Sequence, residues 1–311
     1  MTHTRSWTYA RKVGTCLISG ALLIALSPDV AGRAAPSNSG KLAFEGDRFG
    51  EWGLAAMRPD GSGIVNLDAL PGAADVSWSP NGKKVAFEAD PNNDGNLEVF
   101  VMNADGSNLV QLTDSPDRDY WPDWFPNGKQ IAFTSSRSGV PHIYVMNADG
   151  SDQHALTSGD EMACLEPDVS PNGKQVVFSC ETPTEPPTIW VANADGSNAQ
   201  QLTVPGPGVD INPQWSPNGK TIVFSSNRTG TFEIYLMSAD GNHQVQLTSS
   251  PGGDFNPTFS PDGQSIAWWK ERFGQGDVWT MNRDGSDQVN ITNSPEFEGF
   301  PDWHQGSLRL K

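Results

Sequence analysis

The chain has 311 residues, with 20 lysines and arginines against 37 aspartates and glutamates, and its formal net charge at pH 7 is −17. So acidic a surface repels phosphate backbones and anionic lipid headgroups, which excludes nucleic-acid binding and favours cations or basic protein partners. The 32 glycines and 24 prolines are typical of a turn-rich all-β protein.

The first 35 residues predict an export signal. Basic residues up to Lys12 precede an apolar run at 13–26, and small residues follow around 30–35. The apolar run is too short to span a bilayer comfortably, so we expect cleavage rather than stable membrane insertion, with an uncleaved anchor as the alternative. The expected order is a signal peptide at 1–35, a short linker at 36–40 and a periplasmic or secreted mature protein.

Two kinds of turn recur through the rest of the chain. Ser-Pro-Asn-Gly-Lys, or a close variant, occurs at 79–83, 125–129, 170–174, 216–220 and 260–264. An Asp-Gly turn begins at Asp60, Asp105, Asp149, Asp195, Asp240 and Asp284, with spacings of 44 to 46 residues. Short segments between tight turns at a period in the mid-forties predict propeller blades, each a four-stranded sheet.

The third copy shows the order of strands and turns that we expect in one blade. We expect strands at 121–124, 130–135 and 142–147, and a last strand that ends at Thr157. Proline presets the backbone angle of the first turn and glycine supplies the positive φ that follows, while Asp-Gly between apolar runs predicts a hairpin. Aromatic residues recur in the first and second strands of each copy, where we expect them to pack between blades.

The two ends of the repeat region complete one another. The first copy begins at a second strand, 41–44, and the chain ends with a lone first strand, 300–303. Joining them gives an all-β, six-bladed β-propeller at 41–304, with four antiparallel strands per blade and a C-terminal strand that closes the ring beside the N-terminal strands. Residues 305–311 form a tail.

The repeated text Trp-Ser-Pro-Asn-Gly-Lys, Ile-Ala-Phe, Ile-Tyr-Val-Met-Asn-Ala-Asp-Gly-Ser and Gln-Leu-Thr resembles the propeller repeats of the TolB family. The resemblance implies a periplasmic, protein-binding propeller. TolB proteins carry an α/β domain before the propeller, and nothing in this sequence corresponds to it. The repeats also resemble propellers that cover prolyl-oligopeptidase hydrolases, but the sequence has no Gly-x-Ser-x-Gly nucleophile motif.

Polar residues recur at two positions before the first-strand aromatic, and alternation along a strand predicts that both face the mouth of the central channel. The predicted ligand-binding set is Asp75, Asp119, Glu166, Asp210, Asn212, Asp254, Asn256 and Glu298. Arginines recur on the same face four residues after the second-strand aromatic, at Arg48, Arg137, Arg228 and Arg272. One interpretation is that these arginines pair with the acids and brace neighbouring blades. The other is that the acids bind a cation, either Ca²⁺ or a basic partner segment.

A second acidic segment resembles a calcium loop. Oxygen-bearing side chains alternate around Gly95, at Asp90, Asn92, Asp94, Asn96 and Glu98. The helix-type calcium motif also requires a glutamate at its twelfth position, where this chain has Val101. A solvated turn is the alternative.

Two cysteines flank the turn at 172–173 almost symmetrically. In a hairpin this spacing places Cys164 and Cys180 opposite one another, within disulfide reach. An exported protein makes the bond plausible, and two reduced core thiols are the alternative.

Catalytic patterns are poor, because the histidines are scattered and no nucleophile is paired with a base. We therefore expect an exported, non-catalytic binding module that docks an envelope or extracellular protein, through a basic segment, over the acidic channel mouth. The alternative is a metal-dependent carbohydrate-binding or carbohydrate-degrading propeller.

Overall fold

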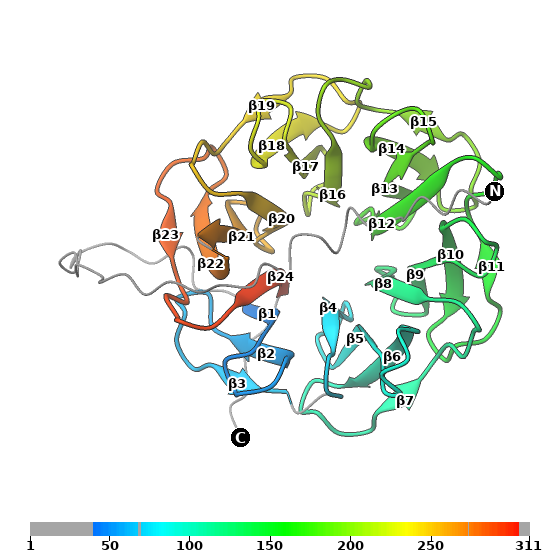
Figure 1. Ribbon diagram of the computed structural model, residues 1–311, viewed down its shortest axis with the longest axis horizontal. Helices are drawn as coiled ribbons and strands as arrows, with labels where there is room; N and C mark the ends of the chain where they lie inside the picture. The colour runs from blue at the N-terminus through cyan, green and yellow to red at the C-terminus, as the bar shows by residue number, and fades with distance from the viewer. Residues whose placement is uncertain (1–39, 68–69, 273, 305–311) are drawn as a thin grey trace, which may run out of the picture.

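Six four-stranded antiparallel sheets stand radially around one axis in the computed structural model (Figure 1). The structure describes residues 40–67, 70–272 and 274–304, and this part of the chain contains no helix long and apolar enough to cross a membrane. The predicted six-bladed propeller is confirmed. The predicted signal peptide, most of the linker and the C-terminal tail lie outside the described residues.

The blades are numbered here in chain order. Blade one contains β24 (Glu298–His304), β1 (Lys41–Gly46), β2 (Gly53–Met57) and β3 (Val65–Asn66). Blade two contains β4 (Ala74–Trp78), β5 (Lys84–Ala89), β6 (Glu98–Asn103) and β7 (Val110–Gln111). Blade three contains β8 (Asp119–Trp124), β9 (Gln130–Ser135), β10 (His142–Asn147) and β11 (His154–Ala155).

The other three blades repeat this order from the axis outward (Figure 1). Blade four contains β12 (Ala163–Val169), β13 (Gln175–Glu181), β14 (Thr188–Asn193) and β15 (Gln200–Gln201). Blade five contains β16 (Asp210–Trp215), β17 (Thr221–Ser226), β18 (Glu233–Ser238) and β19 (Val245–Gln246). Blade six contains β20 (Asp254–Phe259), β21 (Ser265–Arg272), β22 (Gln275–Asn282) and β23 (Val289–Asn290).

The ring closes inside blade one. The last strand, β24, pairs antiparallel with β1, so that Leu42 lies opposite Trp303 and Lys41 lies opposite His304. The two ends of the repeat region therefore share one sheet, as predicted. Closure gives the last strand, β24, a partner in blade one, and the outermost strand of each blade is only two residues long.

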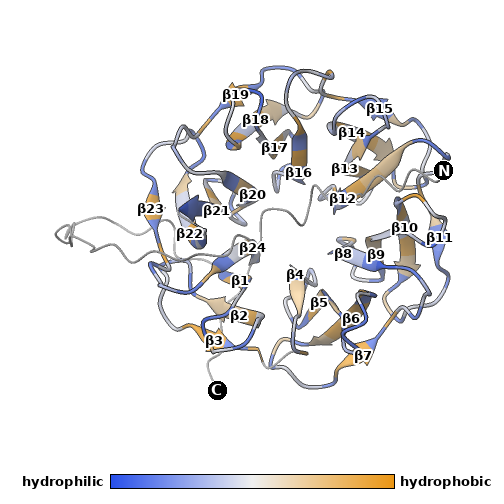
Figure 2. Ribbon diagram, viewed as in Figure 1, coloured by the Kyte–Doolittle hydropathy of each residue, from blue (hydrophilic) through white to orange (hydrophobic). Residues whose placement is uncertain are grey.

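The core lies between the blades. Its largest fully buried side chains include one aromatic residue from the second strand of each blade: Phe44, Phe87, Phe133, Phe178, Phe224 and Trp268. Hydrophobic residues follow the strands, while most connecting loops are hydrophilic (Figure 2). Burying each such ring stabilises the fold by about 2–3 kcal/mol, and the predicted packing role of these aromatic residues is confirmed.

The Asp-Gly turns also join neighbouring blades. Gly196 has a φ of +82°, and a Cβ atom at this position would lie 2.3 Å from the backbone oxygen of Leu156 in the preceding blade. Asp195 accepts hydrogen bonds from both the backbone N–H and the hydroxyl of Ser197, which holds the turn. Glycine is therefore required here by the neighbouring backbone as well as by the turn.

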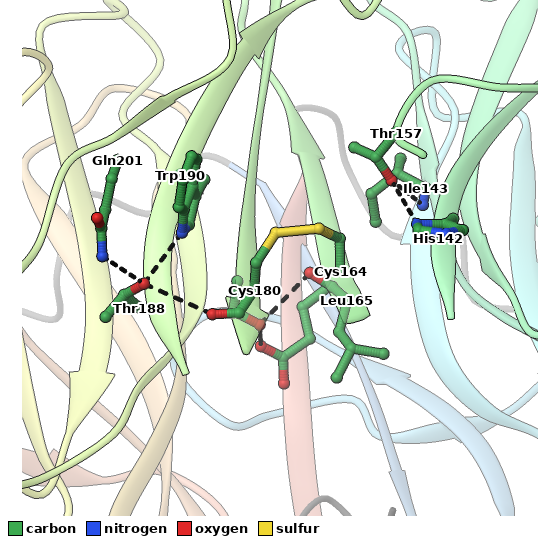
Figure 3. Close-up of a disulfide and its surroundings, with 11 residues drawn as sticks. His142, Ile143, Thr157, Cys164, Leu165, Cys180, Thr188, Trp190 and Gln201 are labelled. Atoms are coloured by element: carbon green, nitrogen blue, oxygen red, sulfur yellow. Dashed lines mark hydrogen bonds between the residues drawn. A yellow bond between two sulfur atoms is a disulfide. The ribbon is translucent and has the colours of Figure 1, made fainter. Parts of the chain in front are cut away.

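A disulfide joins Cys164 of β12 to Cys180 of β13 (Figure 3). The two residues lie directly opposite one another in the register of this strand pair, and both are buried. Beside them, the Thr188 hydroxyl accepts hydrogen bonds from the side chains of Trp190 and Gln201 (Figure 3). The bond ties the innermost strand of blade four to its neighbour at the end next to the β11–β12 loop.

Candidate functional site

Each innermost strand contains a β-bulge, where its register against the second strand shifts. One residue of each bulge has a left-handed φ between 46° and 59° although it is not glycine. These six residues, here called the axial ring, are Asp75, Trp121, Glu166, Asn212, Asn256 and Phe300. A left-handed φ in residues as bulky as Trp121 and Phe300 is uncommon and is typical of sites where a side chain must be re-aimed.

The axial ring surrounds a cavity of about 130 Å³ on the propeller axis. The two residues that follow each ring member also contribute to the wall in most blades. Among the described residues that line it there are five carboxylates and no lysine or arginine: Asp75, Asp123, Glu166, Asp168 and Asp302. This cavity is the strongest candidate for a binding site in the fold, because the bulges project variable side chains toward one point.

Sequence reasoning placed Asp75, Glu166, Asn212 and Asn256 at the channel mouth, and all four line this cavity. It missed the three aspartates directly before the first-strand core residue, Asp123, Asp168 and Asp302. The repeated Pro-Asp before Trp124, Val169 and Trp303 could have identified them.

The three missed aspartates join consecutive blades. In each case a carboxylate oxygen accepts the backbone N–H of the next innermost strand. The Asp123 bond to Val169 is 2.8 Å, the Asp168 bond to Trp215 is 2.7 Å, and the Asp302 bond to Trp78 is 2.9 Å. Gln214 forms the corresponding bond to Phe259, at 2.9 Å. These side chains therefore stabilise the ring as well as giving the cavity its charge.

Burial in the channel raises the pKa of the axial carboxyl groups. The pKa of Asp302 is raised to about 7 and that of Asp123 to about 6, in both cases mainly because the surrounding protein replaces water around the charge. Burial and then the nearby Asp123 raise the pKa of Asp168 well above its usual value. Burial therefore favours the neutral form of these carboxyl groups, and a bound cation would favour the charged form.

Acidic and aromatic side chains alternate in four consecutive blades of the axial ring, in the order Phe300, Asp75, Trp121 and Glu166. Burial raises the pKa of Asp75, and the neighbouring Glu88 and Glu45 add to this shift. Across blades six and one, Phe300 stacks on Trp269 with ring centroids 5.6 Å apart. The wall therefore offers carboxyl groups and aromatic rings side by side.

The other predicted acids lie outside this cavity lining. Asp119, Asp210, Asp254 and Glu298 are the first residues of β8, β16, β20 and β24, and each is buried. The Arg137 guanidinium lies 2.6 Å from Asp119, the Arg228 guanidinium lies 2.8 Å from Asp210, and Arg48 pairs with Glu298. The acid and arginine of each pair belong to the same blade. Arg48 also donates a hydrogen bond to the backbone oxygen of Thr292 in blade six, so the expected bracing of neighbouring blades is found for Arg48, while the ion pairs of Arg137 and Arg228 lie within one blade.

Blade six departs from this pattern. Lys270, with its Nζ 3.7 Å from Asp254 Oδ1, is the basic partner there, while Arg272 is exposed at the end of β21. The bulge is the reason why the predicted set divides in two: its extra residue breaks the alternation, so positions two apart no longer face the same side.

The predicted calcium loop uses its acids internally. Asp90 accepts the backbone N–H of Gly95, and Asp94 accepts that of Asn96. Glu98 is buried and accepts the side-chain amide of Asn96, while Asn92 is exposed. Within 40–67, 70–272 and 274–304, no three His, Cys, Asp or Glu side chains are grouped closely enough to hold a metal ion. Calcium binding stays a prediction.

Known proteins resemble this chain in sequence and in fold. The TolB beta propeller domain matches residues 61–205 and 165–307. The Dipeptidyl-peptidase 5 of Porphyromonas gingivalis is 33% identical over 98 residues, which cover 28% of this chain and 14% of that protein. The Protein TolB homolog of Chlorobaculum tepidum is 40% identical over 63 residues, which cover 20% of this chain and 14% of that protein.

Among solved structures, TolB from Acinetobacter baumannii superposes with a TM-score of 0.71 and 20% identity. The match covers 85% of this chain and 66% of that one. Identity at this level shows a shared fold only. The chain spans about a seventh of the length of the curated relatives that it matches.

Proposed function

This chain belongs to the TolB beta propeller family, and from that premise we propose that it is an exported, non-catalytic binding module. Its axial cavity receives a basic segment of an envelope or extracellular protein. The location follows from the predicted signal peptide at 1–35 and from the resemblance to periplasmic TolB proteins.

The lining of the axial cavity carries this proposal. Five carboxylates surround a space of about 130 Å³, and the described residues of the lining supply no lysine or arginine to neutralise them. Arg48, Arg137 and Arg228 of this face are already paired with the buried acids at the strand ends. A lysine or arginine side chain entering along the axis would meet a focused negative potential, while Trp121 and Phe300 would contact its aliphatic or aromatic neighbours.

The absence of catalysis is part of the same proposal. The relatives named as peptidases share only a short stretch with this chain, 14% of the length in the first case. Three of the axial carboxylates have a structural role, since Asp123, Asp168 and Asp302 accept hydrogen bonds from backbone N–H groups of the next blade. A propeller built in this way serves as a scaffold that presents a charged, rigid opening.

Fluorescence anisotropy with a labelled lysine- and arginine-rich peptide tests the proposal. We expect saturable binding that weakens with salt, and no binding of a glutamate-rich peptide of equal length. The double variant Asp75→Asn, Glu166→Gln should weaken binding about tenfold or more, because two charges are removed from a site partly shielded from solvent.

The matched control is Asp149→Asn, which removes a charge from an Asp-Gly turn at the other end of the strands. Equal binding by the double variant and by this control would refute an axial site. Mass spectrometry of protein secreted by a bacterial host tests export separately, with a mature chain beginning near residue 36 as the expected result.

A further inference from the structure

Blade one lacks an aromatic ring that the other five blades possess. In those blades the second-strand aromatic lies opposite an aromatic residue of the third strand. The pairs are Phe87 with Phe100, Phe133 with Tyr144, Phe178 with Trp190, Phe224 with Tyr235, and Trp268 with Trp279. In four of them the ring centroids are 5.7 to 6.2 Å apart. In blade one, Phe44 lies opposite Ala55.

A cavity of about 530 Å³ lies on this side of blade one, and the buried Phe44 and Ala55 form its floor. The β1–β2 loop, Asn66 of β3 and Leu70 of the following loop also line it. The volume is within the range of about 300–1,000 Å³ that is typical of small-molecule sites. Replacing a large aromatic side chain by alanine leaves space that the surrounding structure fills only in part.

Two exposed aromatic residues stand beside this cavity. Phe49 is 50% exposed and Trp52 is 37% exposed, and both line it. Trp52 also stacks on Phe297, with ring centroids 5.0 Å apart, so one of its faces is held by the protein. Such rings supply large contact area at small cost in side-chain entropy, and they are common around binding sites for planar ligands.

The arginine of this blade indicates which ligands fit. In blades three and five the equivalent arginine lies over both paired rings, at 5.5 and 5.0 Å for Arg137 and at 5.4 and 4.9 Å for Arg228. Arg48 lines the cavity and pairs with Glu298. Its charge is therefore already balanced, so it favours the face of a neutral ring over an anion.

We propose that this cavity binds a small molecule with a neutral aromatic ring, which contacts Phe49 and Trp52 above the position of the missing third-strand side chain. Arg48 contacts the ring as the equivalent arginines do in blades three and five. This site is independent of the axial cavity and goes beyond the proposed protein-binding function.

The test uses indole as the probe, with ligand-observed NMR and a calorimetric titration of the full-length chain. The wild-type protein should bind one equivalent saturably. Ala55→Phe restores the ring found in the other blades, and it should weaken indole binding about tenfold or more and raise the melting temperature. Ala55→Leu is a second, smaller filling variant, in case the larger side chain prevents folding.

The matched control is Val204→Phe, which adds the same side chain at a position that is 83% exposed. Its indole affinity should equal that of the wild type. Indole affinity unchanged in both filling variants would overturn the proposal, and so would the absence of saturable binding to the wild-type protein.

Discussion

Asp302→Asn should make the propeller more stable at pH 8 and leave its stability at pH 4 unchanged. Burial, helped by the charge of Asp123, raises the pKa of Asp302 from an ordinary 3.8 to about 7 in the folded protein. Between these values the folded state holds a proton that the unfolded state has released. The free energy of unfolding therefore falls as the pH rises through this window.

The magnitude follows from the same two pKa values. The difference between 3.8 and about 7 corresponds to about 4 kcal/mol of unfolding free energy at most. Asparagine carries no charge and keeps a side-chain oxygen that can accept the backbone N–H of Trp78, as Asp302 does at 2.9 Å. The substitution therefore removes the buried charge and leaves the bond between blades in place.

Urea unfolding at pH 4, 6 and 8 measures the effect. Asp302 interacts electrostatically with three other titratable groups, Asp123, Asp168 and Lys41. Part of the pH dependence of the unfolding free energy should therefore remain in the variant. Asp117→Asn, at an exposed position, controls for the change in net charge. A variant less stable than the wild type at pH 8 would refute the reasoning, because the carboxylate would then stabilise the ring in its ionised form.

Three further predictions concern the fold. Gly196→Ala should destabilise the protein by more than about 2 kcal/mol, because the new Cβ would lie 2.3 Å from a backbone oxygen of the preceding blade. Gly139 has no atom within 4 Å of such a Cβ, so Gly139→Ala should cost only the backbone strain of about 1–2 kcal/mol. Urea unfolding of both variants measures the difference. Replacing Cys164 and Cys180 by serine should lower stability by about 3 kcal/mol, and a reducing agent should lower the melting temperature of the wild type but not of the variant. Deleting β24 and everything after it should lower the melting temperature far more than deleting only the seven residues that follow it, since β24 closes the ring against β1; equal melting temperatures would contradict the closure argument.

Much of the fold could be predicted from local chemistry. The turn that begins at Asp195 needs Asp-Gly for its own backbone angles, so it is visible in the sequence wherever it recurs. The cysteine pair could be placed because a hairpin brings residues equidistant from its turn into register. The cavity of blade one was missed, because one alanine in a strand shows nothing by itself. Ala55 becomes informative only once Phe44 is seen opposite it.

The repeat period, the turn residues and the complementary ends by themselves determined a closed propeller of six blades. Each of these features depends on residues close together in the chain and can therefore be recognised directly in the sequence. Only the tertiary structure decided which polar side chains meet at the axis. Asp119 and Glu166 occupy related strand positions, yet the first is buried beside Arg137 and the second lines the cavity. A bulge of one residue reverses the side on which the following side chains lie, and whether a strand bulges depends on its partners across the sheet and in the next blade.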